Sequence, residues 1–128
     1  MHSPPRILIA DDHEHNRDIL ATQLATQGYE LLEAVDGEEA LTAARAKLPD
    51  LILLDVMMPK LDGVEVCRRL KSDPDLPFMP IILVTAKSDT DDVIAGLEAG
   101  AIEYLIKPVD ALALVARVKS VLKIKELH

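Results

Sequence analysis

Three short aliphatic segments recur along the chain, and a polar residue follows each of them. The segments span residues 6–10, 51–54 and 81–84, and the residues that follow them are Asp11, Asp55 and Thr85. Because these segments do not alternate polar and apolar positions, we predict strands that are covered on both faces of a sheet. Residues 30–34 and 103–106 are more mixed in polarity and are predicted as strands near the sheet edges. The pattern therefore predicts five strands.

Stretches of helical length separate these strands, and their apolar residues recur three and four positions apart. The N-cap of the fourth predicted helix is Ser88, Asp89 or Thr90, and the fifth predicted helix begins at Asp110. We predict five helices, which end at Gly28, before Pro49, at Asp73, at Gly100 and at or beyond Leu122. Strand and helix thus alternate five times, which is typical of an α/β fold with a doubly wound parallel sheet.

The end of the chain continues the pattern of the fifth helix. Residues 123–128 contain no glycine or proline, and Ile124 and Leu127 begin to leave the earlier apolar stripe. Two interpretations stay open, a frayed terminal turn and a helix that leads into a second domain. We place the domain at residues 1–122 and treat residues 123–128 as the start of a helical linker or a C-terminal tail.

Composition narrows the class of protein. The 128 residues are 49% hydrophobic and 28% charged, which indicates one globular domain and excludes a disordered chain. Its apolar runs are too short to cross a bilayer, so we expect no membrane contact. The net charge of −8 argues against direct nucleic-acid binding. The single cysteine, Cys67, cannot form an internal disulfide, which fits a reducing cytoplasm.

The polar residues that follow the strands point to one site. In an open α/β sheet, ligands bind beyond the carboxyl ends of the strands, where this chain places Asp11, Asp12, Asp55, Thr85 and Lys107. Three carboxylates packed together repel one another unless a cation neutralises them, and Mg²⁺ is the natural partner. Lys107 and Thr85 supply a positive charge and a hydroxyl for a phosphoryl group. Singly, each residue could be a helix cap or a loop residue, but together they predict a phosphoryl acceptor site.

Four other residues near the expected site or surface carry weaker predictions. His13 and His15 invite a transition-metal interpretation, but we interpret them as solvated residues of a loop and a first helical turn. Phe78 lies in the long connection 72–80 and is predicted to anchor that loop. Ile102, if exposed, would widen an apolar contact patch near the output face, and a neutral role stays open as the alternative.

Four runs of sequence resemble the receiver domain of bacterial two-component response regulators. They are residues 7–12, 50–59 together with Asp62 and Gly63, 84–86 and 100–108. The resemblance covers nearly the whole chain in order and spacing, and it implies a flavodoxin-like (βα)5 fold with strand order 2-1-3-4-5. It also implies a regulator rather than an enzyme, one that assists its own phosphorylation and dephosphorylation.

The resemblance assigns roles around the phosphorylated residue. It implies that Asp55 accepts a phosphoryl group from a histidine kinase. Asp12, Asp55 and the backbone carbonyl of Met57 would bind Mg²⁺ directly, and Asp11 would act mainly through a bound water. Lys107 would pair with the phosphoryl oxygens.

The resemblance also implies a phosphate site and a switch. Thr85, Lys107 and the backbone N–H of Ala86 would bind the phosphate, and the bond from Lys107 to Pro108 is expected to be cis. Thr85 would move toward the phosphate, and Tyr104 would turn into the space that Thr85 leaves. These movements would alter the face made by the fourth helix, the fifth strand and the fifth helix.

Partners and alternatives follow from the same comparison. The expected partners are a histidine kinase or phosphotransfer protein and a second copy, which would bind through the face made by the fourth helix, the fifth strand and the fifth helix. An output domain of cyclase or kinase type is also expected, because residues 116–127 look similar to linkers that precede such domains. A phosphatase with an aspartyl nucleophile would need a second aspartate where Met57 stands. A flavodoxin-like electron carrier would need a Ser/Thr-rich phosphate loop, which does not follow the first strand. A receiver that signals without phosphorylation stays open.

Overall fold

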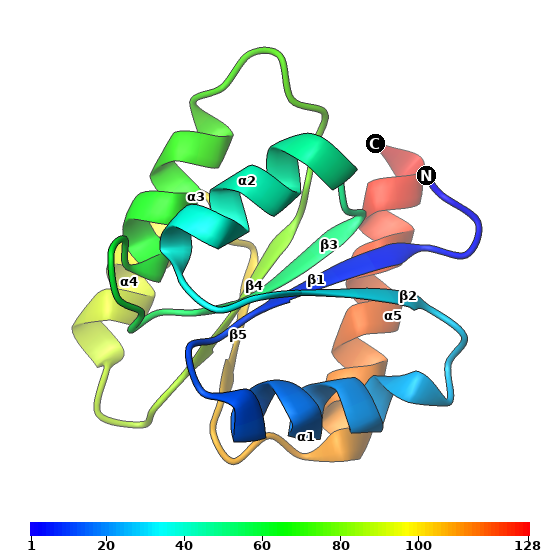
Figure 1. Cartoon of the computed structure of the whole chain (residues 1–128), viewed down its shortest axis with the longest axis horizontal. Helices are drawn as coiled ribbons and strands as arrows, with labels where there is room; N and C mark the ends of the chain where they lie inside the picture. The colour runs from blue at the N-terminus through cyan, green and yellow to red at the C-terminus, as the bar shows by residue number, and fades with distance from the viewer.

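The computed structural model describes residues 1–128 and contains one five-stranded sheet. Its strands are all parallel and lie in the order β2-β1-β3-β4-β5, which confirms the predicted fold class and strand order (Figure 1). The strands are β1 Arg6–Ala10, β2 Glu30–Ala34, β3 Leu51–Asp55, β4 Ile81–Thr85 and β5 Glu103–Ile106. Every residue of β3 and β4 is buried, whereas β2 and β5 are partly exposed, as their mixed polarity predicts.

Five helices cover the two faces of the sheet, α1 and α5 on one face and α2, α3 and α4 on the other (Figure 1). They are α1 Glu14–Ala25, α2 Gly37–Lys47, α3 Gly63–Lys71, α4 Thr90–Glu98 and α5 Ala111–Leu127. Since successive strand residues point to opposite faces, the aliphatic runs feed two separate cores. Ile52 and Leu54 pack into the core under α2 and α3, while Leu51 and Leu53 pack under α1 and α5.

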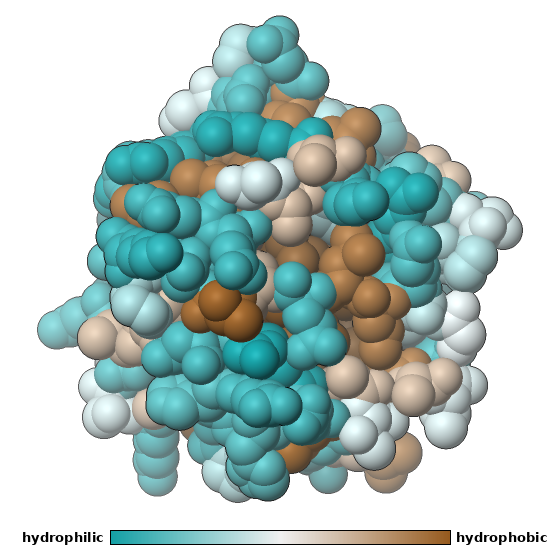
Figure 2. Space-filling model, viewed as in Figure 1, coloured by the Kyte–Doolittle hydropathy of each residue, from teal (hydrophilic) through white to brown (hydrophobic).

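The exposed surface reflects the charged composition. Figure 2 shows one face of the molecule as largely hydrophilic, with apolar atoms visible near the place where Figure 1 draws β2. None of the helices is long and apolar enough to cross a membrane.

Aspartates hold the N-cap position of four helices, and three of them cap the helix with the side chain. The side chains of Asp36, Asp62 and Asp110 each accept a hydrogen bond from a backbone N–H three residues on. Of the three candidates for the start of α4, Asp89 holds the cap position, but its carboxylate makes no such bond. The predicted end of the first helix is slightly wrong: Thr26 is the C-cap of α1, and Gly28, with φ +80°, lies in the turn that follows.

The last helix continues to Leu127, so residues 123–127 are helical. Its end is fixed to the loop before β4, because Lys125 Nζ donates to the carbonyl of Phe78 and the His128 ring stacks on the Phe78 ring. Phe78 therefore anchors its loop, as predicted. Residues 123–128 as the start of a linker stay a prediction.

The structure does not favour the hypothesis that Ile102 widens an apolar contact patch. Ile102 is partly buried and packs against the core beneath α1 and α5. It directly precedes β5. Ile106, at the other end of the same strand, is exposed.

Candidate functional site

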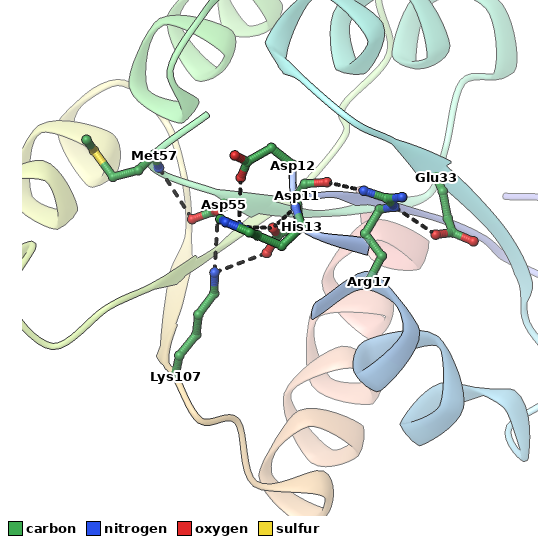
Figure 3. Close-up of polar contacts among 8 residues, drawn as sticks. All are labelled: Asp11, Asp12, His13, Arg17, Glu33, Asp55, Met57 and Lys107. Atoms are coloured by element: carbon green, nitrogen blue, oxygen red, sulfur yellow. Dashed lines mark hydrogen bonds and ion pairs between the residues drawn. The ribbon is translucent and has the colours of Figure 1, made fainter. Parts of the chain in front are cut away.

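The carboxyl ends of β1, β3 and β5 bring two aspartates and a lysine together. Lys107 Nζ lies 3.0 Å from Oδ2 of Asp11 and 3.4 Å from Oδ2 of Asp55 (Figure 3). Both carboxylates are buried, and the lysine side chain is only partly exposed. The prediction that these residues converge is confirmed.

Burial and charge perturb both titratable partners. Burial and, to a smaller extent, the neighbouring charge of Asp11 raise the pKa of Asp55 to about 6, because Lys107 and the N–H of Met57 offset only part of the increase. For Lys107, burial lowers the pKa, but its contacts with Asp11 and Asp55 outweigh burial and leave the pKa raised. One ammonium group therefore faces two buried carboxylates, and the site favours a further cation.

Short turns fix the orientation of both buried carboxylates. The backbone N–H of His13 donates to Asp11 Oδ1 at 2.9 Å, and the backbone N–H of Met57 donates to Asp55 Oδ1 at 3.3 Å. The loop after Asp55 is held by Gly63, whose N–H donates to the carbonyl of Val56 at 2.7 Å. These bonds leave Oδ2 of each aspartate free to face Lys107.

Asp12 supplies an acceptor that has no hydrogen-bond partner. Its Oδ1 is buried and makes no hydrogen bond. The Nδ1 atom of His13 lies 3.2 Å from this oxygen, close enough for an ion pair but outside hydrogen-bond geometry. A buried carboxylate oxygen without a donor is costly, so this atom fits a bound cation. The acidic residues present thus suit a hard divalent ion such as Mg²⁺.

Two residues beside the site were not predicted as part of it. His13 groups with Asp11 and Asp12 as three side chains whose ligand atoms all lie within 4.8 Å of one another. Arg17 donates to the carbonyl of Asp11 at 2.8 Å and pairs with Glu33 at 3.0 Å, which holds the turn between β1 and α1 (Figure 3). Adjacency to the aspartate pair is the sequence signal for His13, whereas Arg17 gives no signal without its partner on β2.

The predicted switch residues lie beside a small cavity. Thr85 is buried, and its hydroxyl donates to the carbonyl of Ala86 at 3.3 Å and to Asp89 Oδ2 at 3.5 Å. Tyr104 is 43% exposed and lines the cavity, which has a volume of about 90 Å³. The other lining residues are Thr85, Ala86, Lys87, Thr90, Val93 and Ile106. The threonine hydroxyl thus has local acceptors, and Thr85 and Tyr104 line the same cavity.

The bond between Lys107 and Pro108 is cis, as the resemblance implies. The chain also matches the family described as the response regulator receiver domain, over residues 7–119. This chain belongs to that family.

Curated relatives of this receiver domain are longer than the chain. The response regulator PleD of Caulobacter vibrioides is 48% identical over 120 residues, which cover 94% of this chain and 26% of the relative. The alkaline phosphatase synthesis transcriptional regulatory protein PhoP of Bacillus subtilis is 46% identical over 122 residues, which cover 95% of this chain and 50% of the relative. The receiver domain therefore spans between about a quarter and a half of these relatives.

Solved receiver structures share its fold over nearly their whole length. A CheY-like receiver domain protein from Methanospirillum hungatei is 31% identical with a TM-score of 0.85, over 95% of this chain and 96% of that one. The signal receiver domain of a modulated diguanylate cyclase from Desulfovibrio desulfuricans is 34% identical with a TM-score of 0.83, over 96% and 97%.

Proposed function

We propose that this receiver domain is a phosphorylation-controlled switch in which Asp55 accepts a phosphoryl group from a histidine kinase or a phosphotransfer protein. The observation that carries the proposal is the contact of Lys107 with the two buried carboxylates of Asp11 and Asp55. Receiver domains as a family have a phosphoacceptor role, and the proposal assigns that role to Asp55 of this chain.

Transfer would form a bond between phosphorus and a carboxylate oxygen of Asp55, while the bond from phosphorus to the donor nitrogen breaks. Such transfers pass through a loose transition state, so the site has to align the groups and neutralise charge rather than move protons. Lys107 already lies 3.4 Å from Asp55 and would follow the phosphoryl oxygens. Its contact with Asp11 keeps the ammonium in place before the donor arrives.

A divalent cation belongs to this proposal. Asp11, Asp12 and Asp55, with the backbone carbonyl of Met57, would hold Mg²⁺, and the bound ion would neutralise charge on the phosphoryl oxygens. Two observations support this assignment. Asp12 Oδ1 is buried without a hydrogen-bond donor, and burial together with the charge of Asp11 raises the pKa of Asp55 despite the contact with Lys107. The ionised form of Asp55 is the nucleophile, and a nearby cation favours it.

Phosphorylation would then act on the switch residues. A phosphorylated Asp55 carries more negative charge and three acceptor oxygens, which attract the hydroxyl of Thr85 and the N–H of Ala86. The weak bonds that Thr85 makes to Ala86 and Asp89 are easily exchanged for a bond to phosphate. Tyr104 could then fill the cavity beside Thr85. A shift from about 1% to about 99% active needs roughly 5.5 kcal/mol of preference for the active state.

The output would leave through the face made by α4, β5 and α5. Exposed apolar residues on this face suit a contact with a second copy or with a linked output domain; they are Ile94, Leu97, Tyr104, Ile106 and Leu112. The relatives are longer than this chain, and one structural neighbour is the receiver of a diguanylate cyclase. We therefore propose that the domain controls a linked output of cyclase or kinase type and has no enzymatic turnover of its own.

The intact mass of the protein after incubation with Mg²⁺ and acetyl phosphate tests the acceptor. The proposal expects one phosphoryl adduct that requires Mg²⁺ and is absent from Asp55→Asn. Asp75→Asn is the matched control, because Asp75 is an exposed aspartate outside the site. An adduct that persists in Asp55→Asn would move the acceptor elsewhere. A folded protein with no adduct and no beryllofluoride binding would favour a receiver that signals without phosphorylation.

A further inference from the structure

The imidazole of His13 lies against the two aspartates that follow β1. Its Nδ1 atom is 3.2 Å from Asp12 Oδ1 and 3.6 Å from Asp11 Oδ1 (Figure 3). Lys107 instead contacts Oδ2 of Asp11. The two oxygens of Asp11 therefore face different groups, the lysine and the His13 residue. The His13 side chain is 68% exposed, so the ring can rotate without disturbing the core.

The spacing of these atoms resembles one edge of a metal coordination sphere. Ligands about 2.1 Å from an octahedral ion lie roughly 3 Å apart at neighbouring positions. The distances from the His13 nitrogen to Asp12 and Asp11 are close to that value, and Asp12 Oδ1 has no hydrogen-bond donor. A nitrogen ligand and carboxylate oxygens are thus available on one side of the site.

A nitrogen donor changes which ion the site prefers. Carboxylate and carbonyl oxygens suit Mg²⁺, whereas imidazole suits first-row transition ions. We propose that His13 is a ligand to the cation of this site and shifts its preference from Mg²⁺ toward later transition ions such as Co²⁺ and Ni²⁺. This inference rests on the proposed function, because the same aspartates hold the ion in both.

His15 provides a matched control in the same sequence. It is exposed like His13, and no hydrogen bond or ion pair joins it to Asp11, Asp12 or Asp55. His13 is the N-cap of α1, and His15 lies in the first turn of that helix. Substitution of either residue by asparagine removes one imidazole from this region. Only His13→Asn removes the nitrogen that faces the two carboxylates.

Metal titrations of the full chain test the inference. Calorimetry would compare Mg²⁺ with Co²⁺ in the unaltered protein, His13→Asn and His15→Asn, and pulsed electron paramagnetic resonance would record bound Mn²⁺. His13→Asn should reduce the preference for Co²⁺ over Mg²⁺ by at least about tenfold. Loss of a residue that only supports a metal ligand already lowers metal affinity by about tenfold or more, and loss of a ligand itself should have at least this effect. The signal of a directly bound nitrogen on Mn²⁺ should vanish in His13→Asn and persist in His15→Asn.

Other results would overturn the inference in distinguishable ways. Mg²⁺ binding with an unchanged metal preference in His13→Asn would refute the role of His13 and leave the proposed function intact. An equal gain in affinity for both ions in His13→Asn would mean that the ring is only an ionic partner of Asp12 and competes with the metal. Failure of the unaltered, folded protein to bind any of the three ions would refute both proposals.

Discussion

The ammonium nitrogen of Lys107 lies 3.0 Å from Oδ2 of Asp11, although 96 positions separate the two residues in the chain. Asp11 follows β1 near the middle of the sheet, whereas Lys107 follows the edge strand β5. The lysine side chain therefore extends across the ends of β4 and β3, and it contacts Asp55 at the end of β3 on the way. One side chain thus connects the ends of three strands.

Replacement of Lys107 by glutamine should destabilise the protein in the absence of divalent ions. The substitution leaves the buried carboxylates of Asp11 and Asp55 without their cation, and a loss of roughly 1–3 kcal/mol is expected for buried charged groups that lose a partner. Urea unfolding followed by circular dichroism measures this loss. Added Mg²⁺ should restore part of the stability, because it supplies the missing positive charge. Lys119→Gln, on the surface of α5, should leave the free energy of unfolding unchanged.

The raised pKa of Asp55 predicts a stability that depends on pH. The folded protein holds the Asp55 proton more tightly than the unfolded chain does, since burial and the neighbouring charge of Asp11 raise the pKa from 3.8 to about 6. The stabilising contribution is thus present below the unfolded pKa and is lost as pH rises through about 6. A shift of this size corresponds to about 3 kcal/mol. Without divalent ions, Asp55→Asn should be more stable than the unaltered protein at about pH 7.5 and nearly equal to it at about pH 4.

The same comparison with added Mg²⁺ provides the control. A cation bound beside Asp55 favours the ionised carboxylate, so Mg²⁺ should stabilise the unaltered protein more at high pH than at low pH. Asp55→Asn should lose most of this pH-dependent gain. Equal pH profiles of the free energy of unfolding in the two proteins would contradict the raised pKa.

Gly63 holds the loop that follows Asp55, and alanine there should disturb the site. A Cβ atom on Gly63 would lie 2.5 Å from the carbonyl oxygen of Asp55 and 2.9 Å from Cα of Val56, and both are backbone atoms that cannot rotate away. We expect Gly63→Ala to cost about 1–3 kcal/mol of stability and to weaken Mg²⁺ binding.

Gly28→Ala is a control that separates the loss of stability from the loss of Mg²⁺ binding. Its φ of +80° makes alanine unfavourable by about 1–2 kcal/mol, but no atom lies within 4 Å of the added Cβ. Gly28→Ala should therefore reduce the melting temperature and leave Mg²⁺ affinity unchanged in calorimetry. A similar loss of Mg²⁺ affinity in both variants would show that general destabilisation, rather than the position of the loop, causes the effect.

The aliphatic strands and the residues that follow them could be predicted because each signal is local. Asp11, Asp55 and Thr85 are next to, or at the end of, unbroken apolar runs, and the parallel topology brings the carboxyl ends of those runs together. The contact of Arg17 with Glu33 and the burial of Ile102 depend instead on side-chain directions between separate elements. No periodicity in the sequence reports such directions, so these features required the structure.

The two tyrosines of the chain allow a direct measurement of the switch. Tyr104 is 43% exposed and lines the cavity beside Thr85, whereas Tyr29 packs against the core beneath α1 and α5. With fluorotyrosine incorporated, the ¹⁹F spectrum should contain two resonances, and Tyr29→Phe assigns them. Beryllofluoride with Mg²⁺ should shift the Tyr104 resonance and protect it from a soluble paramagnetic agent, because the ring moves from solvent into the cavity. The Tyr29 resonance should stay unchanged.

Thr85→Ala tests whether the threonine hydroxyl carries the signal from Asp55 to Tyr104. The variant keeps Asp55, Lys107 and Asp11, so beryllofluoride should still bind, but it lacks the hydroxyl that would leave Ala86 and Asp89 for the phosphate mimic. Without a hydroxyl, residue 85 is not drawn toward the phosphate mimic, so the Tyr104 resonance should respond far less. Full protection of Tyr104 in Thr85→Ala would show that the ring moves independently of Thr85. In that case the larger cavity left by alanine would itself be enough to admit the ring.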